Sequence, residues 1–199
     1  MLLSPDKIKK AVEIIQEGGI IAYPTETFYG LGTNALNAKA VERLFNIKKR
    51  PYTKPIPILI PNLDWLKKLT LSIPPLAEEL IARYWPGPLT IVFAATDLLP
   101  QNLTASTGKI AIRISSHPLA QRLVEVLDIP LTATSANLSQ MPPPTCPDEI
   151  HSEIKAEIDA ILDGGKTKGG LASTIIDVTV NPPQILREGA TKIKLPPLY

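Results

Sequence analysis

Along this chain, apolar residues follow two alternating patterns. In five segments they recur every three or four residues, which is the spacing of an amphipathic helix. The first begins at Ser4-Pro5-Asp6, where a capping serine precedes a proline at the first helical position, and it ends at Gly18-Gly19. The other predicted helices are residues 38–48, 76–84, 118–127 and 148–157.

Short apolar runs lie between these helices, and glycine, proline or polar residues bound them, which is typical of buried strands. Residues 56–60 contain a proline and are therefore expected at a sheet edge. The interleaving of strands and helices predicts an α/β fold, in which helices pack on a sheet. The predicted strands are residues 20–23, 56–60, 89–94, 110–114, 131–134, 160–162, 174–178 and 185–186.

Composition narrows the class of protein. A length of 199 residues with 44% hydrophobic content predicts one globular domain, residues 1–199. No apolar run approaches the length of a membrane span, and the N-terminus lacks the pattern of a secretory signal, so a cytoplasmic location is expected. The single cysteine, Cys146, excludes an internal disulfide. Aromatic content of 5% argues against stacking platforms for single-stranded nucleic acid.

Charge is nearly balanced, with 21 basic and 19 acidic residues, so a local cluster is informative. Lys48-Lys49-Arg50 and Lys54 lie within seven residues, close after the glycine-rich segment 29–32. Pro51 and Pro55 stiffen this stretch. Cations on a stiffened loop favour a site for an anionic ligand.

Several familiar motifs are excluded. Gly164-Gly165-Lys166-Thr167 lacks the first glycine of a phosphate-binding loop, because Ala160 stands there, so a mobile loop is expected. Gly30 and Gly32 follow the preceding strand too late for a dinucleotide fingerprint. They still indicate close approach of backbone to a ligand or to another strand. The two histidines lie in no nucleophile motif, and no cluster has metal-ligand spacing.

Residues 132–139, Thr-Ala-Thr-Ser-Ala-Asn-Leu-Ser, place hydroxyl and amide side chains directly after an apolar strand. Serine and asparagine favour helix caps and Asx-type turns, which is one interpretation of this segment. Small polar residues at the end of an α/β strand also form ligand loops, which is the other.

In this order, the segments resemble the YrdC-like family, whose best-known activity is L-threonylcarbamoyladenylate synthase. The resemblance covers residues 8–189, and its pieces together are specific although each is short. The segments that carry it are residues 23–32, Lys48-x-Arg50, residues 85–90, residues 113–118, Ser135-x-Asn137, residues 173–177 and residues 187–189.

This resemblance implies a twisted mixed sheet with flanking helices around a positively charged concave cavity, in the short single-domain form of the family. It also implies a nucleotidyltransferase that joins ATP, L-threonine and bicarbonate or CO2 to give threonylcarbamoyl-AMP and pyrophosphate. The product would serve the threonylcarbamoyl modification of the tRNA adenosine next to the anticodon, through a separate tRNA threonylcarbamoyl transferase complex.

By the same resemblance, Lys48 and Arg50 would be catalytic, holding the carbamate and the phosphates. Ser135 and Asn137 would bind the phosphate and ribose side of the nucleotide, and Arg187 would close over it. An arginine offers a bidentate fork for such anions.

For the amino acid, the resemblance implies contacts from Thr25, Arg113 and Ser173, with Tyr23 beside the carbamate. No protein metal site is expected, because Mg²⁺ would be held mainly through the ATP phosphates.

One feature departs from the family, since many relatives have a histidine near Ile60-Pro61 and this chain has none. An alternative function is a non-enzymatic RNA-binding member of the family that contacts tRNA or double-stranded or structured RNA. The nearly balanced charge and the low aromatic content argue against that as the primary role. A third interpretation is another carbamoyl- or acyl-adenylate chemistry on the same fold.

Overall fold

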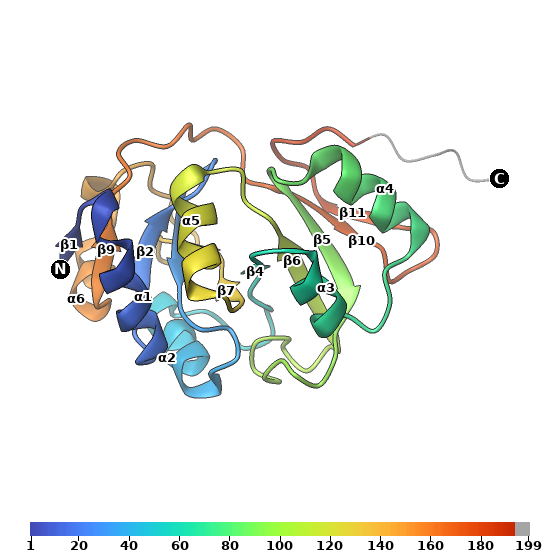
Figure 1. Ribbon diagram of the computed structural model, residues 1–199, viewed down its shortest axis with the longest axis horizontal. Helices are drawn as coiled ribbons and strands as arrows, with labels where there is room; N and C mark the ends of the chain where they lie inside the picture. Colours follow the sequence, from blue (N-terminus) through green and yellow to red (C-terminus); the bar gives the residue numbers. More distant parts are fainter. Residues whose placement is uncertain (194–199) are drawn as a thin grey trace.

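The computed structural model describes residues 1–193 and arranges them as two mixed β-sheets flanked by helices (Figure 1). Sheet A has the strand order β1-β9-β2-β3-β8, and sheet B has the order β11-β10-β5-β6-β4-β7. The strands are β1 (Leu2–Leu3), β2 (Ile21–Pro24), β3 (Tyr29–Gly32), β4 (Ile58–Leu59), β5 (Leu89–Ala94), β6 (Lys109–Arg113), β7 (Leu131–Thr132), β8 (Thr134–Ser135), β9 (Ala160–Leu162), β10 (Thr174–Asp177) and β11 (Gln184–Arg187).

The helices flank the sheets on the outside of the molecule. All five predicted helices are confirmed, and the predicted mixed α/β class is confirmed with two sheets in place of one. The helices are α1 (Ile8–Gln16), α2 (Ala38–Lys48), α3 (Leu63–Leu69), α4 (Pro75–Tyr84), α5 (Pro118–Leu127) and α6 (Ser152–Glu157), with 3₁₀ turns at Pro5–Lys7 and Pro147–Glu149.

Helix α3 was not predicted, although its start carries a recognisable signal. The side chain of Asn62 accepts hydrogen bonds from the backbone N–H groups of Asp64 and Trp65, as an N-cap does. Ser4, in contrast, does not cap the first helix, because its hydroxyl bonds to Asp6 and a 3₁₀ turn precedes α1.

Strand β4 corrects the expectation of an edge strand at residues 56–60. It comprises only Ile58–Leu59 and lies inside sheet B, between β6 and β7. Its prolines flank the paired residues and so interrupt no ladder bond. The carbonyl of Pro57 accepts a hydrogen bond from the backbone N–H of Ala133 at 2.7 Å, which extends the pairing of β4 with β7 by one bond beyond β4.

The predicted strand at residues 131–134 is divided between the two sheets. Leu131 and Thr132 pair with β4 in sheet B, whereas Thr134 and Ser135 pair with β3 in sheet A. Only Ala133 separates the two pairings. This short segment therefore joins the sheets and fixes their relative position.

Strand β3 was not predicted, because its glycines weaken the pattern of a strand. Gly32 lies under the ring of Tyr23, and a Cβ added there would come within 2.7 Å of that ring and 3.0 Å of Leu131. Tyr23 is fully buried, and its hydroxyl donates to the backbone oxygen of Thr132 at 2.9 Å. The expected close approach at these glycines is thus partly an approach to a neighbouring strand.

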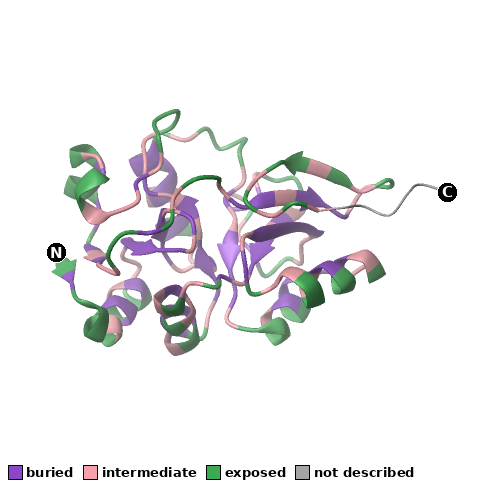
Figure 2. Cartoon of the chain, turned by 90° about the horizontal axis from the view of Figure 1, so that it is seen from above, coloured by how far each residue is buried: buried purple, intermediate pink, exposed green. Residues whose placement is uncertain are grey.

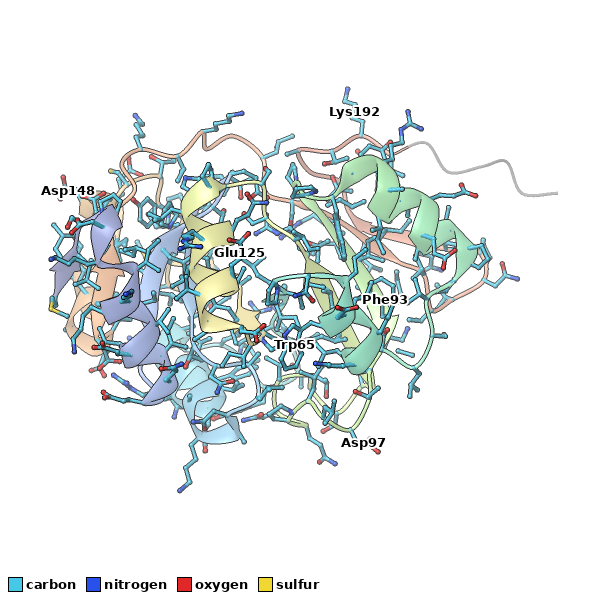
Figure 3. All side chains as sticks on the ribbon, viewed as in Figure 1. Trp65, Phe93, Asp97, Glu125, Asp148 and Lys192 are labelled. Atoms are coloured by element: carbon cyan, nitrogen blue, oxygen red, sulfur yellow. The ribbon has the colours of Figure 1, made fainter. Side chains whose placement is uncertain are left out.

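Two clusters of buried side chains hold the layers together. The first cluster lies where helices α1 and α5 pack on β2 and β9 of sheet A. The second cluster extends from sheet A through α2 to sheet B, α3 and α4. Figure 2 shows the strands mostly buried and the outer helix faces exposed. Figure 3 labels Phe93 on β5 of sheet B and Trp65 on α3. Asp97, Asp148 and Lys192 lie at the periphery of the same view.

The packing of Gly32 generates a stability prediction with a control in the same strand. Gly32→Ala should lower the free energy of unfolding by about 1–3 kcal/mol, because the added methyl group overpacks against Tyr23 and Leu131. Gly30→Ala should cost less, since the nearest atom to its Cβ lies at 3.4 Å. Urea unfolding measures the free energy of unfolding of both variants. An equal decrease in the two would show that the contacts of Gly32 with Tyr23 and Leu131 do not set the cost.

Candidate active site

A cavity of about 380 Å³ lies between the two sheets and is within the size range of small-molecule sites. The wall from sheet A comes from β3, β8 and the turn that precedes β3. The other wall is sheet B, where alternate residues point to the same face. Those residues are Thr90 and Val92 on β5, Ala111 and Arg113 on β6, and Ser173 and Ile175 at β10.

Three arginines, Arg50, Arg113 and Arg187, line this cavity, and the part of the chain that the structure describes adds no Asp or Glu to the lining. The positive potential of the cavity as a whole remains a prediction. Such a lining suits an anionic ligand, because guanidinium groups bind carboxylates and phosphates in a bidentate manner.

Arg187 is held by Ser173. Its Nε donates to the backbone oxygen of Ser173 at 2.9 Å and its Nη2 donates to the Ser173 hydroxyl at 3.0 Å. That hydroxyl also lies 2.9 Å from the hydroxyl of Thr90. Burial, and to a smaller degree the charge of Arg113, lowers the pKa of Arg187, although a guanidinium stays protonated near neutral pH.

Arg50 is held by the stiffened loop that follows α2. Its Nε donates to the backbone oxygen of Lys54 at 3.0 Å and its Nη2 donates to that of Pro55 at 2.9 Å. Burial lowers the pKa of this guanidinium as well. The predicted loop of cations therefore presents one of its members, Arg50, to the cavity, while Lys49 pairs with Glu153 at the surface.

Lys48 lies behind the cavity wall and is 2% exposed. Its Nζ donates to the backbone oxygens of Ser135 at 2.5 Å and Asn137 at 2.7 Å, and it lies 3.3 Å from Asn137 Oδ1. Burial, and then the charge of Arg50, lowers the pKa of Lys48 to about 7, whereas the three oxygens favour the protonated form. Lys48 thus fixes the loop that carries Ser135 and Asn137.

Ser135 and Asn137 line the cavity and also bond to each other. The hydroxyl of Ser135 donates to Asn137 Oδ1 at 2.5 Å, and Asn137 Nδ2 donates to the backbone oxygen of Met141. These bonds form neither a helix cap nor an Asx-type turn, because no described backbone N–H donates to either side chain. The role of residues 132–139 as a ligand loop stays a prediction for side chains that line the cavity.

Thr25 lines the cavity from the turn between β2 and β3, where its hydroxyl donates to the backbone oxygen of Phe28 at 2.7 Å. The same turn carries Glu26, which sequence reasoning missed. Glu26 bonds to Arg113, 87 residues away, and to Ser115. Only its place inside the recognised segment 23–32 could have indicated a role, because its partner is distant along the chain.

Tyr29 is the second site residue that the sequence analysis missed. It lines the cavity and connects it to the loop of residues 164–170. Its hydroxyl donates to the backbone oxygen of Gly165 at 2.8 Å and accepts from the N–H of Gly164 at 3.1 Å. Burial raises the pKa of Tyr29 to about 12. The same loop is also held at Thr167, whose backbone N–H donates to the carbonyl of Thr145 at 2.8 Å. The role of residues 164–170 as a lid remains a prediction.

Seven of the nine predicted site residues line the cavity, and the two that do not are Tyr23 and Lys48, both buried behind its wall. Their assigned roles remain predictions. Near the expected place of the family histidine, Ile60 is fully buried and is absent from the lining. Its backbone N–H donates to the carbonyl of Arg113 at 3.1 Å.

Residues 1–193 contain no group of three His, Cys, Asp or Glu side chains placed to hold a metal ion. None of the helices within this range is long and apolar enough to cross a membrane.

Comparison with known proteins gives consistent results. The sequence model of the Sua5/YciO/YrdC domain, described as telomere recombination, matches residues 13–189. The chain is 41% identical to the threonylcarbamoyl-AMP synthase of Pyrococcus abyssi, over 94% of this chain and 55% of the relative. It is 35% identical to a putative threonylcarbamoyl-AMP synthase of Methanocaldococcus jannaschii, over 96% of this chain and 92% of the relative.

Among solved structures, the crystal structure of P. abyssi Sua5 complexed with L-threonine is similar, with a TM-score of 0.91 and 39% identity. The match covers 95% of this chain and 57% of that one. The chain spans about half the length of the first curated relatives that it matches, namely 55%, 53% and 48%.

The environment of Lys48 predicts a pH dependence of stability. A lysine whose pKa is about 7 in the folded state and its ordinary 10.5 in the unfolded chain binds fewer protons when folded at intermediate pH. The wild-type protein should therefore gain stability relative to Lys48→Met as pH rises above about 7, by up to about 1.4 kcal/mol per pH unit. Below pH about 7 the difference should become constant, because both states hold the proton.

Urea unfolding of both proteins from about pH 6 to about pH 9 measures this difference. Lys49→Met is the matched control, since it removes the neighbouring lysine, whose Nζ pairs with Glu153 at the surface. A pH-independent difference between wild type and Lys48→Met would show that the three oxygens keep Lys48 protonated throughout.

Proposed function

This chain belongs to the Sua5/YciO/YrdC family, and from that premise we propose that it is an L-threonylcarbamoyladenylate synthase. In the proposed reaction ATP, L-threonine and bicarbonate or CO2 give threonylcarbamoyl-AMP and pyrophosphate. The names of the relatives support this activity, and the threonine bound in P. abyssi Sua5 supports the amino-acid substrate.

The observation that carries the proposal is the convergence of distant segments on one cavity. Thr25, Arg113 and Ser173 line it together with Arg50, Ser135 and Asn137. The first three come from the turn before β3 and from sheet B, and the others come from the loop after α2 and from β8 and the residues after it. One cavity thus holds the side chains expected to bind the amino acid together with those expected to bind the nucleotide.

The chemistry requires positioning of anions more than an activated nucleophile. The amine of threonine forms a bond to the carbon of bicarbonate and water leaves, which gives a carbamate. A carbamate oxygen then forms a bond to the α-phosphorus of ATP, and the bond from that phosphorus to the pyrophosphate oxygen breaks. The substrate supplies its own nucleophile, so the protein contributes orientation and stabilisation of charge.

In the proposal, Arg113 and Ser173 hold the amino-acid carboxylate, with Thr25 nearby. Arg50 contacts the carbamate and the phosphates, because two backbone carbonyls hold its guanidinium at the cavity. Lys48 supports this end of the site through the backbone of Ser135 and Asn137, and its expected catalytic role stays a prediction.

At the nucleotide end, Ser135 and Asn137 contact the phosphate and ribose. Arg187 contacts the nucleotide from sheet B, where it lines the cavity beside Ser173. The described lining residues contain no carboxylate and so do not form a cage for Mg²⁺. Any Mg²⁺ would arrive with the ATP phosphates.

The product would be consumed by a separate transferase complex that modifies the tRNA adenosine next to the anticodon. Direct contact with tRNA or double-stranded RNA and the cytoplasmic location also remain proposals.

The test is an assay of pyrophosphate release by the purified chain with ATP, bicarbonate and L-threonine. Release should occur only when threonine is present. Arg50→Ala should lower kcat/KM at least about tenfold, or about 1.4 kcal/mol, because it removes a charge that stabilises the transferring phosphoryl group.

Arg83→Ala is the control, since Arg83 is an exposed arginine on α4 that is absent from the cavity lining. Its kinetics should match those of the wild type. Threonine-independent release, no release at all, or faster turnover with another amino acid would contradict the proposed function.

A further inference from the structure

A buried ion pair joins the two sheets behind the amino-acid end of the cavity. Glu26 lies on the turn between β2 and β3 of sheet A, and its partner Arg113 ends β6 of sheet B. Their side chains are 9% and 8% exposed. Within residues 1–193, this is the ion pair in which both side chains are nearly inaccessible to water.

The carboxylate of Glu26 is itself held on both oxygens. Oε1 accepts from Nη1 of Arg113, and Oε2 accepts from the hydroxyl of Ser115. The hydroxyl oxygen of Ser115 in turn accepts from the backbone N–H of His117 at 3.2 Å. A chain of hydrogen bonds thus fixes the carboxylate and, through it, the guanidinium.

The two members of the pair differ in their access to the cavity. Arg113 lines it, whereas Glu26 does not. In the described part of the chain, only Nη1 of Arg113 has a protein acceptor. The Nε and Nη2 donors therefore remain for a ligand, and an edge of the guanidinium with two N–H groups matches a carboxylate.

We propose that Glu26 is a positioning residue that fixes Arg113 so that its free edge receives the carboxylate of the amino-acid substrate. This inference rests on the proposed function for the identity of that substrate. An arginine that is already held loses less side-chain freedom on binding, which raises affinity without any new contact to the ligand.

The negative charge of Glu26 has a second consequence. It offsets the charge of Arg113, so this end of the cavity attracts a triphosphate less strongly than an unpaired arginine would. Arg50 and Arg187, which are held by neutral acceptors, retain their full charge. Glu26 therefore favours a monocarboxylate at Arg113 and leaves the phosphates to the other two arginines.

The experiment is a double-mutant cycle with Glu26→Gln and Arg113→Gln. Glutamine keeps the shape of Glu26 and one acceptor oxygen, so the fold is retained while the charge is lost. Glu26→Gln should raise KM for L-threonine about tenfold, the expected scale for a charge-assisted hydrogen bond, with KM for ATP changed less than about twofold. In the Arg113→Gln background the same change should have no further effect on threonine.

Asp177→Asn is the matched control. Asp177 is a buried carboxylate in sheet B that pairs with Lys109 at 2.9 Å and does not line the cavity. Its loss should lower thermal stability and leave KM for threonine unchanged. The inference is overturned if Glu26→Gln raises KM for threonine equally in both backgrounds, or raises both KM values together, as a general loss of structure would.

A second measurement does not depend on turnover. In ¹⁵N NMR spectra the Nε–H signal of Arg113 should report a restrained guanidinium in the wild type and a mobile one in Glu26→Gln. An Arg113 signal unchanged by Glu26→Gln would overturn the positioning role, whatever the activity. Absence of threonine-dependent pyrophosphate release by the wild type would instead overturn the proposed function, while the NMR result would still decide the role of Glu26.

Discussion

The hydrogen bonds from the Lys48 side chain to the backbone oxygens of Ser135 and Asn137 are the interaction on which the rest of the site depends. Residues 131–135 belong first to sheet B and then to sheet A, so their path sets how the sheets meet. Lys48, in the last turn of α2, holds the end of that path. Without it, two backbone oxygens would lose their donor, and a buried polar group without a partner is costly.

The same principle extends to the three arginines of the cavity. Arg50 is held by two backbone carbonyls, Arg187 by Ser173 and Arg113 by Glu26. Each cation therefore has its position set before a ligand enters. Preorganised charge stabilises a transition state without reorganisation during the reaction, which explains how a site without a histidine or cysteine in its described lining could serve adenylation of a carbamate.

Local patterns along the sequence predict the elements well and their assembly poorly. Helix 38–48 and strand 89–94 have their predicted bounds, because the helical spacing of apolar residues marks the helix and a short apolar run marks the strand. Strand β3 was missed because its glycines have low strand propensity, and it is explained by the ring of Tyr23 that lies against Gly32. The division of residues 131–135 between two sheets leaves no local signal.

The same distinction applies to the site. Motif resemblance brought Arg50, Ser135 and Asn137 to attention, and the structure places all three at the cavity. It could not show that Lys48 points to backbone oxygens, nor that Glu26 meets Arg113, because both contacts join segments about 87 residues apart. Contacts of this kind depend on topology, which the pattern of one sequence does not contain.

In the proposed mechanism, one cavity between the two sheets holds both substrates, and Lys48 supports its wall. A crystal structure of the chain with threonylcarbamoyl-AMP would show whether both parts of the ligand lie in this cavity. We expect the amino-acid carboxylate at Arg113 and the phosphate beside Arg50, Ser135 and Asn137. Lys48 Nζ should still donate to the two backbone oxygens. A ligand bound outside the cavity, or Lys48 Nζ withdrawn from those oxygens to contact the phosphate, would contradict this mechanism.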